Sequence, residues 1–307
     1  MTKTVCGGII LLKTIAKEEV VHMNSKTKGV LYIIAAAFGF SMMSVFVHLA
    51  GDMPAMQKAF FRNIAALAVV SVIMLKKHIN IKPGKGNIPA LLCRAGFGTI
   101  GLVCNFYAID RLVLADANML NKLSPFFAII FSVFLLKEKP SVVQIIGVLT
   151  AFIGSLLIIK PSMGGYAVFP AAVGAAGGLF AGLAYTFVRY LGGRKENSFV
   201  IIFFFSAFSS LACLPFMIMN FSALSLKSFI YLICAGLSAC IGQFGITRAY
   251  LFAPAKEISV YDYTQVIFAA IFGFFLFGQI PDALSIAGYF LICGAGAAMF
   301  LYNRHRD

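Results

Sequence analysis

The chain has 307 residues, of which 61% are hydrophobic and only 12% are charged. Soluble globular proteins are about 45–50% apolar and about 25% charged, so this composition excludes an ordinary soluble domain. The 32 Phe and 11 Tyr also exclude a disordered chain. The formal charge of +14 does not indicate nucleic-acid binding, because the chain lacks a soluble domain that could carry a basic surface. The sequence therefore predicts an integral membrane protein with no nucleic-acid partner.

The first 28 residues are expected to form a cytosolic tail. The apolar stretch Val5–Leu12 is shorter than the about 20 residues that a membrane span requires, and no small-residue cleavage site of a signal peptide follows it. Met23–Lys26 directly precedes the first long apolar run and reads as a natural start. We interpret residues 1–22 as a mis-assigned start or, failing that, as a mobile tail that membrane insertion does not need.

Ten runs of mostly apolar residues follow the tail, each bounded by Gly, Pro or charged residues. Their hydrophobicity is continuous and lacks the alternation of a barrel strand, so we expect ten transmembrane helices in an all-α protein. The connections are short, and none could fold as a separate domain. The expected spans are 29–50, 56–75, 88–109, 115–136, 141–159, 167–189, 198–219, 228–251, 256–278 and 282–302.

Basic residues are distributed unevenly between the connections. With the N-terminus in the cytosol, sixteen Lys and Arg lie on the inner side, against only Arg111, Lys160 and Lys227 on the outer side. Cytoplasmic segments of membrane proteins carry such an excess. We therefore expect the N-terminus and the C-terminal tail 303–307 in the cytosol, and the net charge needs no acidic partner.

The two halves of the chain resemble each other at a fixed offset. Pro140 and Pro281, which lie 141 residues apart, occupy the same interhelical corner, and Gly147 and Gly288 follow at the same offset. The match needs no gap from the first span to the last. The same offset pairs Cys93, Gly101, Ala108 and Phe127 with Cys234, Gly242, Ala249 and Phe268.

An odd number of spans in each repeat has a topological consequence. The second repeat, residues 161–302, enters the membrane upside down relative to the first, residues 29–160. In proteins with such inverted repeats, solutes bind near the midplane between the halves, and access alternates between the two sides. This organisation is typical of a carrier.

Motifs in both repeats are similar to those of a known family. The resemblance is to the EamA family of the drug/metabolite transporter superfamily, and it covers about residues 29–302. It implies a ten-helix carrier of small organic solutes with a central cavity between the halves. The segments concerned are Ala115–Ala117, Leu123–Phe127, Leu135–Pro140 and Gly147 in the first copy, and Tyr263–Val266, Leu276–Pro281 and Gly288 in the second.

The chain departs from the family pattern at Gln279. The corresponding residue of the first copy is the usual acid, Glu138. If the family's acid closes a contact between loops, the neutral side chain predicts a weaker contact on the outer side.

Lys122 and Asp262 are the strongest candidates for a binding site. An ionisable side chain at membrane depth costs at least about 2.5–3.5 kcal/mol on insertion scales, so it normally faces a cavity or a partner. Lys122 shares a helical face with Asn118, Asn121 and Pro125, and the repeat offset places Asp262 opposite Asn121 in the ninth span. We expect Lys122 in the outer half of the membrane and Asp262 in the inner half, binding the ends of a zwitterion or closing gates. The alternative is that each only pairs with another helix.

Arg94 is the third ionisable candidate. It lies about two turns into the third span and shares a stripe with Asn105, and its planar guanidinium suits a carboxylate or a phosphate. It would bind the solute directly or pair with Asp262. The other residues expected to line the substrate cavity are Ser44, Tyr107, Tyr185, Tyr261, Tyr263 and Gln265, together with His48, for which a simple helix-end position is the alternative.

Other residues in the spans are interpreted as structural. Arg62 matches an apolar stretch of the second repeat, and Lys58 lies close enough to a helix end to extend to the lipid headgroups. Gly174, Gly178 and Gly182 form a stripe of small residues that allows another helix to approach closely.

The sequence contains no motif for catalysis or for a cofactor. Six of the seven Cys lie within expected spans without metal-ligand spacing, only four His are present, and GxSxG, HExxH and P-loop motifs are absent. We expect no enzymatic activity, no cofactor and no metal. Without an ATP-binding domain, the energy for transport must come from a gradient or from exchange.

These features predict a secondary transporter of the plasma membrane that moves a small polar or zwitterionic, amino-acid-like metabolite by alternating access. The resemblance favours export. Uptake is the alternative direction, a channel is the alternative within transport, and an intramembrane enzyme acting on lipid or acyl substrates is the alternative in another class. The expected partners are the solute and the lipid bilayer, and a homodimer is compatible with the sequence.

Overall fold

The computed structural model describes residues 25–137, 141–159, 168–252 and 261–304, and the regular elements in these ranges are all α-helices. Helices satisfy the backbone hydrogen bonds within one segment, which an apolar environment demands. The helices are α2 (Ser25–Leu49), α3 (Ala55–Lys76), α4 (Ile88–Ile109), α5 (Leu114–Asn121), α6 (Ser124–Leu135), α7 (Val142–Ile159), α8 (Val168–Gly193), α9 (Ser198–Met219), α10 (Leu226–Phe252), α12 (Thr264–Phe277) and α13 (Ala283–Arg304).

Most of these helices are long and apolar enough to cross a bilayer. By length and composition, α2, α3, α4, α8, α9, α10 and the combined α5–α6 segment are seven candidate spans. The apolar stretches of α7, α12 and α13 are shorter. The prediction of an all-helical membrane protein is therefore confirmed, whereas the number of ten spans remains a prediction.

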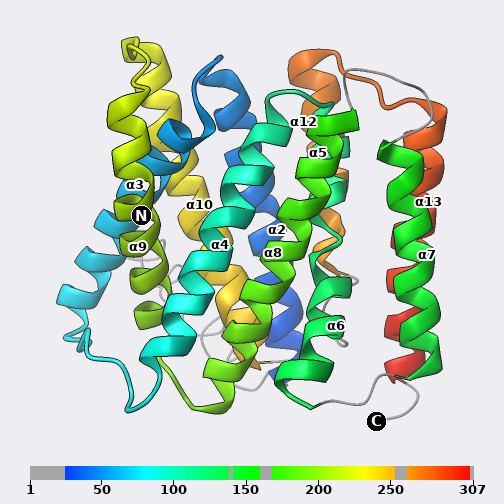
Figure 1. Ribbon diagram of the computed structural model, residues 1–307, viewed down its shortest axis with the longest axis horizontal. Helices are drawn as coiled ribbons and strands as arrows, with labels where there is room; N and C mark the ends of the chain where they lie inside the picture. The colour runs from blue at the N-terminus through cyan, green and yellow to red at the C-terminus, as the bar shows by residue number, and fades with distance from the viewer. Residues whose placement is uncertain (1–24, 138–140, 160–167, 253–260, 305–307) are drawn as a thin grey trace, which may run out of the picture.

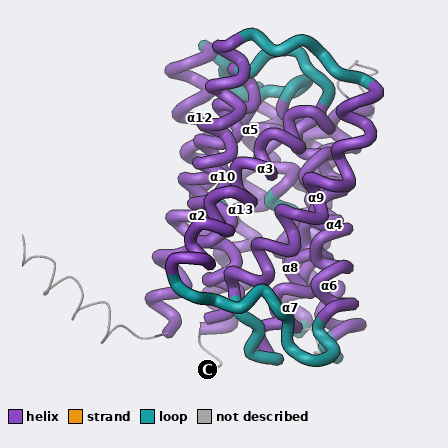
Figure 2. Tube along the Cα trace, turned by 90° about the vertical axis from the view of Figure 1, so that its left-hand side faces the viewer, coloured by secondary structure: helices purple, strands orange, loops and turns teal. Residues whose placement is uncertain are grey.

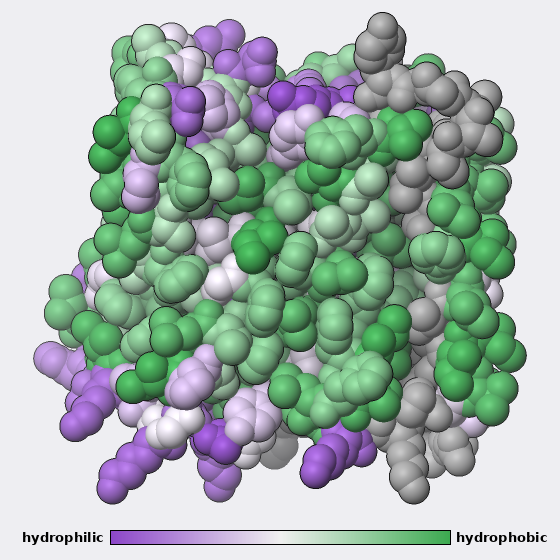
Figure 3. Space-filling view, viewed as in Figure 1, coloured by the Kyte–Doolittle hydropathy of each residue, from purple (hydrophilic) through white to green (hydrophobic). Residues whose placement is uncertain are grey.

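The helices stand side by side, and their connections gather at the two ends of the bundle (Figures 1 and 2). Hydrophobic side chains cover the middle of the face in Figure 3, and hydrophilic ones lie towards its ends. The connection between α3 and α4 exposes Lys76, Lys77, Lys82 and Lys85. We expected this connection on the cytosolic side, and it lies at the bottom of Figure 1.

The fourth expected span is broken in its middle. α5 ends at Asn121, and α6 begins at Ser124 with Pro125 in its first turn. Pro125 has no N–H that could donate to the carbonyl of Asn121 four residues earlier, so a continuous helix loses a bond at this point. The backbone N–H of Lys122 donates to the carbonyls of Asn118 and Met119, at 3.1 and 3.0 Å. The segment Leu114–Leu135 still forms one candidate span, as the sequence predicts over 115–136, but its helix is interrupted just before Pro125.

The ninth expected span is broken at the equivalent place. Asp262 is helical, Tyr263 forms a turn, and α12 begins at Thr264. The repeat offset of 141 residues pairs Tyr263 with Lys122, which lies at the first break. Each half of the chain therefore interrupts its fourth expected span at the same point of the repeat.

The glycine stripe of α8 packs against the first break. A Cβ atom on Gly178 would lie 2.6 Å from the carbonyl oxygen of Leu120, and one on Gly182 would lie 2.6 Å from that of Ser124. Only glycine allows α8 to approach α5 and α6 this closely. The stripe therefore has the packing role that the sequence predicts.

Helices of the first half pack mainly on helices of the second. α2 lies along α10, α4 along α8, α3 along α9 and α7 along α13. The repeat offset relates α2 to α8 and α4 to α10, so the first two contacts join equivalent pairs of helices. α7 and α13 lie together at one side of the bundle (Figure 1).

Some expectations concern segments outside the described residues. These are the tail 1–22, Glu138 and Pro140 in the corner of the first repeat, and residues 253–260 at the start of the ninth expected span.

Candidate functional site

Lys122 and Asp262 form a buried ion pair between the two broken spans. The Nζ atom of Lys122 lies 2.7 Å from Oδ1 of Asp262, and the two side chains are 3% and 1% exposed. We expected the two charges in opposite halves of the membrane, and that expectation was wrong because both breaks lie where α5 and α12 meet. The second carboxylate oxygen of Asp262, Oδ2, has no hydrogen-bond partner within the described ranges.

A cluster of uncharged polar groups adjoins the pair. Oδ1 of Asn118 accepts hydrogen bonds from the hydroxyl of Ser44, at 3.2 Å, and from Nε2 of Gln265. Its Nδ2 donates to the carbonyl of Leu114 at 2.7 Å. Asn118 and Ser44 are fully buried. The hydrogen bond between them connects α2 to the broken span.

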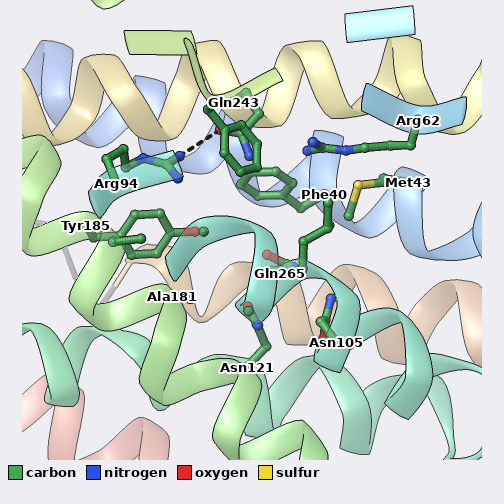
Figure 4. Close-up of a pocket in the computed structure, with 15 residues that line it drawn as sticks. Phe40, Met43, Arg62, Arg94, Asn105, Asn121, Ala181, Tyr185, Gln243 and Gln265 are labelled. Atoms are coloured by element: carbon green, nitrogen blue, oxygen red, sulfur yellow. Dashed lines mark hydrogen bonds between the residues drawn. The ribbon is translucent and has the colours of Figure 1, made fainter. Parts of the chain in front are cut away.

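A polar cavity lies between the two halves of the chain, lined by α2–α5, α8, α9, α10 and α12 (Figure 4). Its enclosed free volume is about 50 Å³. That volume holds a few water molecules, whereas pockets for organic ligands have about 300–1,000 Å³. Helices must therefore move apart before an organic solute can enter. Its polar lining consists of Arg62, Arg94, Asn105, Asn121, Tyr185, Gln243 and Gln265.

Two arginines point into this cavity from opposite sides (Figure 4). The guanidinium carbons of Arg62 and Arg94 lie 5.7 and 4.4 Å from the ring centroid of Phe205, so both cations face one aromatic side chain. Arg94 donates from Nη2 to Oε1 of Gln243 at 3.2 Å, and Arg62 donates from Nη1 to Oδ1 of Asn63. The alternative that Arg94 pairs with Asp262 was wrong, because Lys122 occupies that position.

Sequence reasoning missed Arg62 and Gln243. Arg62 was interpreted as structural because its repeat partner is apolar, yet it is fully buried and lines the cavity. Its position well inside an apolar span was a sufficient signal, since a charge at that depth normally faces a cavity or a partner. Gln243 lies on α10 and carries no charge, so no pattern distinguished it.

The structure separates the remaining candidates into two groups. Arg94, Asn105, Asn121, Tyr185 and Gln265 line the cavity. The others do not line this cavity: Ser44, Asn118, Lys122, Asp262 and Tyr263 are buried in helix contacts, and His48, Tyr107 and Tyr261 lie elsewhere.

The three residues that lie elsewhere have identifiable surroundings. His48 packs on the ring of Phe277 with centroids 4.5 Å apart and lines a separate hollow near Asp110. Tyr107 lies under the guanidinium of Arg111, whose carbon is 3.9 Å from the ring centroid. The carbonyl of Tyr261 accepts a hydrogen bond from the hydroxyl of Thr264 at 2.7 Å.

Lys58 does not extend to the headgroups as expected. Its side chain is fully buried and forms an ion pair with Asp110, which follows the last residue of α4. Burial raises the pKa of the Asp110 carboxyl, and the neighbouring Lys58 opposes that shift. Lys58 therefore fixes α3 to the connection between α4 and α5.

Polar contacts join the connections at both ends of the bundle. At the end of the bundle that holds the connections α3–α4 and α8–α9, Oε2 of Glu196 accepts hydrogen bonds from the backbone N–H of Gly84 and from Nδ2 of Asn87, at 2.9 and 2.7 Å. At the other end, Oε1 of Gln279 accepts from the backbone N–H of Leu114 at 3.0 Å. The neutral Gln279 therefore makes a contact of the kind that an acid would make.

The sequence matches one family along most of its length. The profile of the EamA-like transporter family matches residues 27–160 and 169–302. A solved crystal structure of a protein superposes on this chain with a TM-score of 0.69 at 16% sequence identity, covering 92% of this chain and 99% of the other. At that identity the superposition shows a shared fold.

Several similar proteins are named as transporters. The pseudopaline exporter CntI of Pseudomonas aeruginosa is 35% identical over 275 residues, which cover 88% of this chain and 95% of that protein. The human solute carrier family 35 member G1 is 26% identical, with coverages of 88% and 79%. A riboflavin transporter of Brucella anthropi is 23% identical, with coverages of 90% and 98%.

Proposed function

The chain belongs to the EamA-like transporter family of the drug/metabolite transporter superfamily, and from this membership we propose that it is a secondary transporter that exports a small polar or zwitterionic, amino-acid-like metabolite. The protein is a multi-pass membrane transporter and not an enzyme. The substrate class, the direction and the location in the plasma membrane belong to the proposal.

The buried ion pair carries this proposal. Lys122 and Asp262 join two helix breaks that occupy equivalent positions in the two halves, at 2.7 Å. Discontinuous helices near the midplane form the solute and ion sites of many secondary transporters. The attraction between the two buried charges offsets their loss of hydration only while they stay in contact, so whatever separates them must compensate both.

The proposed mechanism is alternating access between two inverted repeats of five spans. The contacts of α2 with α10 and of α4 with α8 support it, because the repeat offset converts one contact into the other. Two equivalent interfaces can exchange their roles when one end opens and the other closes. The contacts of Glu196 at one end and of Gln279 at the other join connections of the two halves.

A zwitterion is suited to open the ion pair. Its ammonium group can replace Lys122 beside Asp262, and its carboxylate can take the place of Asp262 beside Lys122. The exchange keeps both buried charges compensated, whereas an apolar solute would leave them unpaired at a large cost. Binding of the solute and separation of the two breaks are therefore coupled.

The relatives support the direction of transport. The relative with 35% identity is named an exporter of pseudopaline, and a more distant one is named a riboflavin transporter. We transfer export from the former, since its similarity extends over 88% of this chain.

The test is solute flux in proteoliposomes. Purified full-length protein is reconstituted, and a panel of labelled amino acids, dipeptides and related zwitterions is followed in both directions under imposed proton and sodium gradients. We expect saturable flux of at least one zwitterion that exceeds flux in protein-free liposomes. Asp262→Asn should abolish that flux, whereas Arg111→Gln, which changes an exposed charge, should preserve it. Absence of flux for the whole panel, or equal flux in Asp262→Asn, contradicts the proposal.

A further inference from the structure

Arg62 and Arg94 are buried cations without an acidic partner among the described residues. The two residues are 0% and 2% exposed, and their hydrogen-bond acceptors are the neutral amides of Asn63 and Gln243. The ion pairs that the described part of the chain forms are Lys58 with Asp110 and Lys122 with Asp262. Neither pair includes either arginine.

Several N–H groups of the two arginines have no acceptor among the described residues. Nε and Nη2 of Arg62 and Nε of Arg94 are buried and make no hydrogen bond within this part of the chain. A buried donor without an acceptor loses its hydration and gains nothing in exchange, and the loss is larger when the donor is charged. Two neighbouring residues of the cavity also have free acceptors, Oδ1 of Asn105 and Oε1 of Gln265. The cavity is thus built for hydrogen bonds that the chain itself does not complete.

The ring of Phe205, which both arginines contact, does not replace an anion. A cation–π contact stabilises a cation much less than the burial of its charge destabilises it. Phe205 does hold both guanidinium groups in place, at 5.7 and 4.4 Å from its centroid. Figure 4 shows the guanidinium groups of Arg62 and Arg94 directed towards the cavity.

We infer that Arg62 and Arg94 form an oxyanion subsite, and that the transported solute carries two negative charges, as two carboxylates or one phosphate, bound between them. A guanidinium offers donors in a planar fork that matches the oxygens of either group. Two charges on the solute would compensate the two on the protein. This inference rests on the proposed function and adds the charge of the substrate to it.

The subsite is distinct from the ion pair. Lys122 and Asp262 compensate each other and do not line the cavity, whereas Arg62 and Arg94 line it and lack compensation. Asn105, Asn121 and Gln265 also line the cavity and offer amides for the uncharged part of a solute.

The test compares pairs of ligands that share a carbon chain and differ in one acidic group. Glutarate has two carboxylates, and glutaramate has one carboxylate and one amide on the same carbon chain. Glycerol 3-phosphate and glycerol form the second matched pair. Binding to the purified full-length protein is followed as a shift of the thermal midpoint with a thiol-reactive dye, because the chain has no Trp but contains buried Cys213 and Cys240.

We expect the dianion of at least one pair to bind at least tenfold more tightly than its matched partner. Preference for glutarate assigns the subsite to carboxylates, and preference for glycerol 3-phosphate assigns it to a phosphate; both support the inference. Arg62→Gln and Arg94→Gln should each remove the preference, and Arg62→Lys should retain part of it. Without ligand, neither Gln variant should lower the thermal midpoint, since each removes an uncompensated buried charge.

Arg248→Gln is the matched control. Arg248 also packs over aromatic rings, at 5.7 Å from Tyr32 and 5.6 Å from Phe199, but does not line the cavity. This variant should keep the preference for the dianion. If the Gln variants fail to fold, the comparison of matched ligands on the unmodified protein still decides the question.

Equal binding of both members of each pair, or no binding of any of the four, overturns the inference. An unchanged preference in both Arg62→Gln and Arg94→Gln also overturns it. These outcomes leave the proposed function intact if zwitterion flux is observed in liposomes. Conversely, a dianion preference without any flux supports the subsite and contradicts transport, because binding does not require turnover.

Discussion

Lys122 and Asp262 are separated by 140 residues in the chain, yet Nζ of the lysine donates a 2.7 Å hydrogen bond to Oδ1 of the aspartate inside the bundle. Each residue lies at a helix break that the two halves share. The pair therefore connects the two repeats at the place where each has lost the continuity of its helix.

Removing one member of the pair should destabilise the protein. Lys122→Met leaves the Asp262 carboxylate buried without a cation, and Asp262→Asn leaves the ammonium without an anion, so each should lower the free energy of unfolding by about 3–5 kcal/mol. Combining Lys122→Met with Asp262→Leu should recover most of this loss without restoring flux. Thermal midpoints and liposome flux of the three variants measure both effects. Single variants with the original stability would show that the contact is not a compensated ion pair.

Pro125→Ala should make the broken span more continuous. The new N–H can donate to the carbonyl of Asn121, and alanine favours a helix interior over proline by about 3 kcal/mol. We expect a thermal midpoint that is not lowered and a flux reduced by about tenfold, which is about 1.4 kcal/mol in the barrier. Pro215→Ala is the control, because Pro215 lies inside α9 and outside the cavity. Equal effects of the two substitutions would contradict a special role for the first break.

Gly182→Ala should disturb the contact between α8 and α6. The added Cβ would lie 2.6 Å from the carbonyl oxygen of Ser124, so the helices must separate, at a cost of about 1–3 kcal/mol. Gly96→Ala on α4 meets nothing within 4 Å and should stabilise by up to about 1 kcal/mol through helix propensity. Opposite shifts of the thermal midpoint are the expected result, and shifts of the same sign would contradict the packing argument.

Gln279→Glu should strengthen the contact with Leu114. At present the backbone N–H of Leu114 donates a 3.0 Å hydrogen bond to Oε1 of the Gln279 amide. Hydrogen bonds to charged groups contribute about 1.5–3 kcal/mol, against about 0.5–1.5 kcal/mol for neutral ones. Because Gln279 is partly exposed, we expect a gain at the low end of this difference. Gln279→Leu should lower the thermal midpoint. A midpoint that is equal in all three proteins would show that the contact does not hold this end closed.

The positions of most helices followed from the sequence. The predicted spans 88–109 and 198–219 coincide with α4 and α9, and the glycines of α8 pack as their spacing predicts. The family was also accessible, through the motifs around Pro125 and Pro281. These features are local, because the burial of about 20 apolar residues and the loss of a backbone donor depend on neighbours along the chain.

Only the tertiary structure decided which polar groups meet. Arg62 had an apolar repeat partner and yet faces the cavity, while Tyr107 and His48 had favourable spacing and lie away from it. Spacing along a helix determines which residues share a face, but the rotation and the depth of that face are set by the helices packed against it. The contact of α5 with α12 brings Lys122 next to Asp262, and α9 brings the ring of Phe205 into contact with two arginines. Since these contacts join residues more than a hundred positions apart, no local pattern specifies them.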